Sequence, residues 1–158
     1  MNSFNNISIV VNTTNIENSL DSTRSFGLSL NKTLTIIKMV HWYTQNYNAH
    51  KILGDLYESL SDLFDKLQEE IIGTCQQQNK PFPQIFIDLD SDNIQNYIPE
   101  NQKNMESYYK VNQTICAALK SPEFNSFLES VTSGINNTKE EILSQFNKAN
   151  YLLNMVEL

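Results

Sequence analysis

The chain has 158 residues and a formal net charge of −7, with 11 Lys and Arg against 18 Asp and Glu. This length suits a single domain with one hydrophobic core. An acidic chain gains little from counterion release at phosphates, so we expect no nucleic-acid partner. No apolar run is long enough to span a bilayer, and the first residues lack the basic start of a signal peptide, so we expect a cytoplasmic protein without a membrane partner.

The first part of the chain predicts an arm followed by a helical hairpin. Residues 1–24 are rich in Asn, Ser and Thr, which indicates a flexible N-terminal arm before a helical domain at residues 25–158. A first helix is expected over residues 25–45, because its apolar side chains and His41 recur every three or four residues. Asn46 and Asn48 suit the turn that follows. A second helix is expected over residues 48–73, ending near Gly73.

The second part predicts a long connection and two further main helices. Three prolines within residues 79–99 exclude a continuous helix there, so we expect an ordered crossover. A third helix is expected over residues 100–120, and Ser121-Pro122-Glu123 then has the order of a helix start for a short helix. The last helix is expected to begin near residues 136–138, where Thr138-x-x-Glu141 matches a capping box. Four main helices with one crossover, between helices two and three, predict an all-α four-helix bundle.

The unusual polar residues predict a metal site that needs two copies of the chain. Asp65 and Glu69 lie one helical turn apart and can bind one ion together, and carboxylates with imidazoles suit iron, manganese or zinc. His50 precedes Asp65 by 15 residues on the same helix, which is roughly 22 Å at 1.5 Å per residue. Two second helices packed antiparallel about a two-fold axis near Glu58 would bring His41 and His50 of one chain to Asp65 and Glu69 of the other. We therefore expect a homo-oligomer, at least a dimer.

The segment from His41-Trp42 to Glu69 resembles the Dps-type mini-ferritins that protect DNA in starved bacteria. Those proteins carry His-Trp at the end of their first helix, a second His at the start of the next, and Asp-x-x-x-Glu further along it. The resemblance implies a ferritin-like bundle whose iron-oxidising site is shared across a dimer two-fold. It assigns His41 and His50 to one chain, Asp65 and Glu69 to its partner, and a place beside the site to Trp42.

This chain departs from the mini-ferritin pattern in three ways. Gly54 stands where those proteins have an Asp ligand, the two histidines are closer together, and the basic tail of some members is missing. Glu58, one turn beyond Gly54, is a candidate replacement for the lost carboxylate. The expected cofactor is iron, with manganese or zinc as alternatives and no metal as a further one. The candidate ligands are His41, His50, Asp65, Glu69 and Glu58.

The chain is also similar to a ferritin-like family of tailed phages and giant DNA viruses. The shared blocks are His41-Trp42-x-Thr44, Ala49-His50-x-x-Leu53-Gly54-x-x-Tyr57, Asp65, Glu69 and Tyr151-Leu152-Leu153. This resemblance implies a viral protein, present in the host cytoplasm or in a virion. It assigns no activity, so two functions stay open: a metal-binding ferroxidase, and a catalytically inactive structural or interaction protein built on the same bundle.

Each candidate residue also has an ordinary structural interpretation. His41 lies on an apolar stripe and fits a buried, hydrogen-bonded histidine. Asp65 and Glu69 fit a solvated helix face, because other charged residues are close by. Trp42 fits an anchor in the core or in an interface. Cys75 and Cys116 are far apart without a metal-binding or redox spacing, which predicts unpaired thiols in a reducing compartment.

Overall fold

A computed structural model of the chain describes residues 13–87, 89 and 104–156. This part of the chain is all-helical, as the sequence predicts, and contains no strand. None of the described helices is long and apolar enough to cross a membrane. The helices are α1 (Thr13–Tyr43), α2 (Tyr47–Gln78), α3 (Asn104–Leu119), α4 (Pro122–Ser130) and α5 (Ile135–Asn154).

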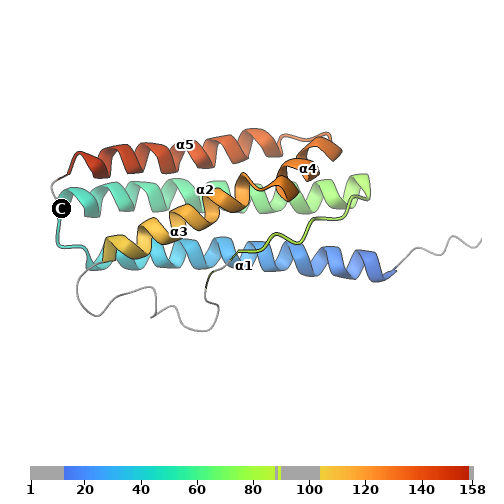
Figure 1. Cartoon of the computed structure of the whole chain (residues 1–158), viewed down its shortest axis with the longest axis horizontal. Helices are drawn as coiled ribbons and strands as arrows, with labels where there is room; N and C mark the ends of the chain where they lie inside the picture. The colour runs from blue at the N-terminus through green and yellow to red at the C-terminus, as the bar shows by residue number, and fades with distance from the viewer. Residues whose placement is uncertain (1–12, 88, 90–103, 157–158) are drawn as a thin grey trace, which may run out of the picture.

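The four longer helices lie lengthwise beside one another (Figure 1). α1 and α2 form an antiparallel hairpin, and α2 packs between α1 and α5. α3 packs mainly against α1 and runs in the same direction as α2 (Figure 1). The α1–α2 turn, the start of α3 and the end of α5 therefore share one end of the molecule (Figure 1).

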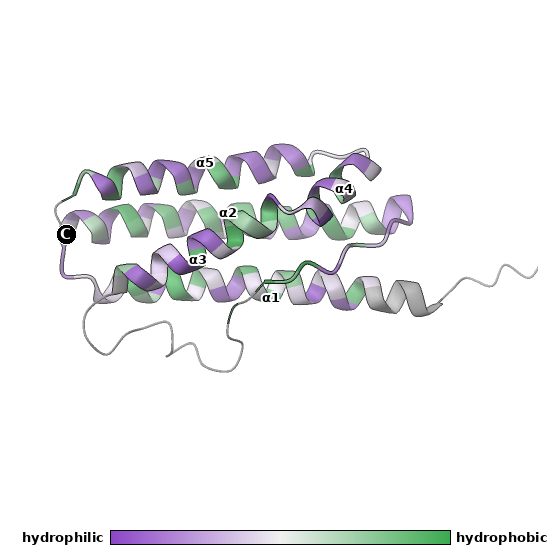
Figure 2. Cartoon of the chain, in the orientation of Figure 1, coloured by the Kyte–Doolittle hydropathy of each residue, from purple (hydrophilic) through white to green (hydrophobic). Residues whose placement is uncertain are grey.

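The core forms where the apolar stripes of the helices meet. Figure 2 shows apolar and polar residues alternating along α2 and α5, as in amphipathic helices. Most of the apolar positions predicted along each helix are buried, including Phe26 on α1, Leu60 on α2, Ile115 on α3 and Phe146 on α5. Burial of a large apolar side chain contributes about 1.5–3 kcal/mol, so these stripes supply most of the driving force for assembly.

Two helix boundaries differ from the sequence predictions. α1 begins at Thr13, so residues 13–24 are helical and only residues 1–12 of the predicted arm lie outside the described residues. α2 continues past Gly73 to Gln78 and ends at Asn79, which takes a left-handed conformation with φ of 49°. The predicted crossover is described at residues 79–87 and 89, where Phe82 is buried and its amide donates to Ser19 Oγ at 3.0 Å. Residues 88 and 90–103 lie outside the described part.

The two last helices test two capping predictions. Ser121 caps α4 as predicted: its hydroxyl accepts a hydrogen bond from the Phe124 amide at 3.2 Å, and Pro122 takes the first turn. The capping box at Thr138 is wrong, because α5 begins at Ile135 after Gly134 and Thr138 lies inside the helix. The Thr138 hydroxyl instead donates to Glu70 Oε2 on α2 at 2.7 Å. The Thr138 hydroxyl thus bonds to a residue on another helix, whereas the sequence pattern predicted that it caps its own helix.

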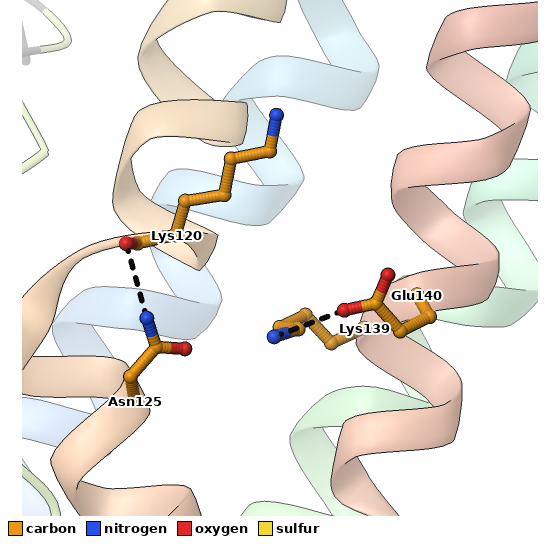
Figure 3. A network of polar contacts seen from close by, with 4 residues as sticks. All are labelled: Lys120, Asn125, Lys139 and Glu140. Carbon is orange, nitrogen blue, oxygen red and sulfur yellow. Dashed lines mark hydrogen bonds and ion pairs between the residues drawn. The ribbon is translucent and has the colours of Figure 1, made fainter.

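Polar contacts also hold the corner where α3 meets α4. Asn125 Nδ2 donates to the backbone carbonyl of Lys120 at 3.3 Å, one of the carbonyls that a helix end leaves without a partner in its own backbone (Figure 3). Lys139 extends from α5 toward this corner, and its ammonium lies 3.1 Å from Glu140 Oε1 (Figure 3). The Lys139 side chain is only 9% exposed, so its hydrocarbon stem contributes to the packing of α5.

Candidate metal centre

The α1–α2 turn places the two histidines of the chain next to each other. α1 ends at Tyr43, and the Thr44 amide bonds back to the Val40 carbonyl at 2.9 Å. Asn46 caps α2, with its side chain accepting from the Ala49 amide at 3.0 Å, as its place in the predicted turn suggested. His41 therefore occupies the last turn of α1, and His50 the first turn of α2.

The two imidazoles make reciprocal hydrogen bonds across the turn. His41 Nδ1 lies 2.7 Å from the His50 carbonyl oxygen, and His50 Nδ1 lies 2.8 Å from the His41 carbonyl oxygen. The rings stack with their centroids 3.9 Å apart and their planes 25° apart. The bond to the His41 carbonyl also satisfies one of the acceptors that the end of α1 leaves open.

These bonds determine which nitrogen of each ring carries the proton. A carbonyl oxygen can only accept, so Nδ1 of both rings must be the donor. In the neutral imidazole, Nε2 then has a lone pair and no proton. A backbone carbonyl that holds the far nitrogen of a ring is the common second-shell arrangement of metal-binding histidines. Both histidines are partly exposed.

Gly54 makes room for the His41 ring. A Cβ built on Gly54 would lie 2.9 Å from His41 Cε1, closer than real Cβ atoms approach, and 3.2 Å from His41 Nδ1, which is a tight contact. The sequence comparison with mini-ferritins treated Gly54 as the position of a missing ligand. The structure gives this glycine a steric role that the sequence analysis missed, and the glycine inside an otherwise strong helical pattern was the available signal.

The three candidate carboxylates are separate from the histidines within the chain. Asp65, Glu69 and Glu58 are all exposed on α2. Among the described residues, no group of three or more His, Cys, Asp and Glu side chains could hold a metal ion. The structure thus brings His41 and His50 together and leaves the acids on the outer face of the helix, as the helical spacing requires. Within the described part of the chain, the two imidazoles are therefore the candidate ligands that lie together, and the candidate acids do not join them.

Aromatic side chains surround the histidine turn on the outside. Trp42 is 62% exposed, and Tyr43 and Tyr47 on the same turn are exposed too. Within one chain Trp42 is therefore not a core residue. An exposed tryptophan next to His41 is available for an interface or for reporting on the histidines.

A buried polar network between α3 and α5 was not anticipated from the sequence. Tyr108 donates its hydroxyl hydrogen to Asn150 Oδ1 at 2.7 Å, and Asn112 Nδ2 donates to the same oxygen at 2.7 Å and to the Tyr108 hydroxyl at 3.1 Å. The thiol of Cys116 donates to Asn112 Oδ1 at 3.4 Å. Burial raises the pKa of the Tyr108 phenol well above its ordinary value of 10.0, although the bond from Asn112 acts in the opposite direction. An asparagine one turn after Tyr108 on the inward stripe of α3 was the sequence signal.

The helical fold and the histidine turn define the class: an all-helical protein with a paired-imidazole site at one end. Residues 41–153 match the model of a family of unknown function, DUF5856. The chain therefore belongs to this family, and the matched segment begins at His41 and includes all the candidate ligands. No curated protein and no solved structure matches the chain.

Proposed function

We propose that this chain is a ferritin-like, four-helix metal-binding protein that acts as a homodimer and oxidises iron at centres shared between the two copies. The arrangement of α1, α2, α3 and α5 supports the ferritin-like assignment, because four long helices lie side by side and α2 and α3 run in the same direction. The resemblance of the segment from His41 to Glu69 to mini-ferritins supports iron as the ion.

The observation that carries the proposal is the hydrogen bonding of the two imidazoles. Both rings donate through Nδ1 to backbone carbonyls, which leaves both Nε2 atoms as lone-pair donors on partly exposed side chains. Asp65 and Glu69 are exposed on α2 and so are available to a second copy. Glu58 lies on the same face and is a further candidate ligand near the two-fold axis.

The stacking of the rings indicates how many ions the centre would take. The Nε2 lone pair lies in the plane of its ring, and the planes are 25° apart with centroids 3.9 Å apart. The two lone pairs therefore do not meet within the reach of a metal–nitrogen bond of about 2.0–2.1 Å. Each imidazole would hold its own ion, with Asp65 and Glu69 of the partner subunit completing the coordination. Bound iron would supply the capacity to reduce oxygen or peroxide, and the protein's part is to hold the ligands in place.

Metal titration of the apoprotein tests this proposal. We expect anaerobic Fe(II) to bind and to quench the fluorescence of Trp42, the single tryptophan of the chain. His50→Ala and Glu69→Ala should each weaken binding by at least about tenfold, since each removes a ligand. Glu129→Ala is the matched control, because Glu129 is an exposed acid on α4. Wild-type protein that binds no Fe(II), or variants that bind as well as wild type, would contradict the proposal.

The second candidate is an interaction protein without catalysis, and a specific observation favours it. The reciprocal bonds of His41 and His50 join α1 to α2 through protein groups alone, and Trp42, Tyr43 and Tyr47 expose an aromatic surface beside them. On this account, replacing both histidines with Ala lowers the melting temperature, while wild-type protein shows no metal-dependent change in Trp42 fluorescence.

A further inference from the structure

The close approach of His41 to Gly54 has a stereochemical cause. In an α-helix, Cβ atoms tilt toward the N-terminus, so the side chain of residue 54 would overlie the carbonyl of residue 50. That carbonyl is the one to which His41 Nδ1 donates at 2.7 Å. Any side chain at position 54 would therefore occupy the space through which the imidazole reaches its acceptor.

The ring cannot easily move away from an added Cβ. It is stacked on the His50 ring at 3.9 Å and bonded to the His50 carbonyl, so displacement sacrifices both contacts. Gly73, on the same helix, has nothing within 4 Å of a Cβ added there. A glycine inside a helix is less stable than an alanine in the same place. At position 54 this cost has a steric purpose that is absent at position 73.

We propose that Gly54 is the positioning residue of the centre: it fixes His41 as the Nδ1–H tautomer and thereby presents a bare Nε2. A carboxylate side chain at position 54 would displace the His41 imidazole. Each chain would therefore offer only imidazole ligands, and no carboxylate, at the α1–α2 turn. Resting on the proposed metal-binding function, this favours ions that imidazole suits, such as zinc or iron, over manganese and magnesium, which prefer oxygen ligands.

Histidine tautomers report on this role without any metal. In two-bond ¹H–¹⁵N spectra of the apoprotein, at a pH above the ordinary histidine pKa, both wild-type rings should show Nδ1–H. Free imidazole side chains in water favour the Nε2–H form, so Gly54→Ala should return His41 to mainly Nε2–H, and Gly73→Ala should change neither ring. A wild-type His41 with Nε2–H, or an unchanged tautomer in Gly54→Ala, would overturn the proposal.

A thermodynamic cycle provides a second readout if Gly54→Ala folds poorly. With His41 present, Gly54→Ala should lower the melting temperature, because the Cβ collides with the ring. In a His41→Ala background the same substitution should raise it, because alanine is the better helix former. The same sign in both backgrounds would show that the ring and the glycine do not interact, and would refute the proposal.

Metal-binding measurements distinguish a failure of this inference from a failure of the proposed function. We expect zinc to bind wild type and Gly73→Ala equally, and Gly54→Ala at least about tenfold more weakly. Manganese should bind the wild type more weakly than zinc. A Gly54→Ala variant with an altered tautomer and undiminished zinc binding would overturn the link to the ligand. Altered tautomers with no ion bound by the wild type would refute the metal function and leave the positioning of His41 intact.

Discussion

Tyr108 shows how a single buried group makes stability depend on pH. Its side chain is fully buried, and its hydroxyl bonds to Asn150 and Asn112, so the neutral phenol is held among satisfied partners. Burial raises the phenol pKa in the folded state above the ordinary 10.0 that it regains on unfolding. As pH rises past the ordinary value, the unfolded chain loses this proton while the folded chain keeps it.

Because the unfolded chain loses the Tyr108 proton first, we predict that the free energy of unfolding falls progressively as pH rises above 10.0. Tyr108→Phe removes the ionisable hydroxyl and should flatten the fall, although it lowers stability at neutral pH by about 1–3 kcal/mol because Asn112 and Asn150 lose a partner. Urea unfolding of both proteins across this range measures the difference. Parallel pH profiles for the wild type and the variant would show that Tyr108 is not responsible. Tyr151→Phe, at an exposed tyrosine, is the control.

At the scale of the helices, the contact between Glu70 and Thr138 joins α2 to α5. Thr138 is fully buried, and its hydroxyl donates to the Glu70 carboxylate at 2.7 Å. α5 begins at Ile135 after its N-cap Gly134, which has no side chain, and the Ser133 hydroxyl accepts from the Ile135 amide at 3.3 Å. A carboxylate near the start of α5 also interacts favourably with the positive end of the helix dipole. This contact therefore joins the first turn of α5 to α2, through a side-chain hydroxyl rather than a backbone amide.

We predict that Thr138→Val destabilises the protein by about 1 kcal/mol, since it removes a hydrogen bond to a charged group on a partly exposed carboxylate. Valine matches threonine in shape and in helix propensity, so packing changes little. Thermal or urea unfolding measures the loss. Thr35→Val on the exposed face of α1 is the matched control, because the Thr35 hydroxyl donates only to the Asn31 carbonyl of its own helix. Equal losses in the two variants would contradict the prediction.

These contacts also explain which helix boundaries could be predicted from the sequence. The apolar stripes of α2 and α5 and the Ser121-Pro122 start of α4 depend on local patterns, and they are confirmed. The start of α1 and the interior position of Thr138 depend on partners far along the chain, as the bond between Ser19 and Phe82 and that between Thr138 and Glu70 show. Local composition carries no information about such partners, so the Asn- and Ser-rich start of α1 was assigned to the arm.

The candidate site, too, could be predicted only in part from the sequence. The proximity of His41 and His50 follows from helix spacing and a short turn, which the sequence contains. The direction of their hydrogen bonds and the steric role of Gly54 follow from the packing of α1 on α2, which the local sequence does not show.

At the scale of the whole molecule, the negative charge on the outer face of α2 must be neutralised if two copies are to pack through this face. This face is mainly acidic, with Lys51 and Lys66 among exposed Asp55, Glu58, Asp62, Asp65 and Glu69. Two such faces packed antiparallel about an axis near Glu58 would bring Asp55 of one copy close to Asp62 of the other. Like charges repel across such a contact, and bound cations or salt reduce the repulsion. Assembly and metal binding are therefore expected to strengthen each other.

Complementation between two defective chains tests most directly that the centre is shared between copies. One chain carries His41→Ala and His50→Ala, and the other carries Asp65→Ala and Glu69→Ala. Each alone should fail to bind Fe(II), but a mixed dimer rebuilds one centre from the histidines of the second chain and the acids of the first. Fe(II) binding and Trp42 quenching should therefore return on mixing after dissociation and reassembly. If the mixture binds no more Fe(II) than the separate chains, while light scattering shows that dimers form, the shared centre does not exist.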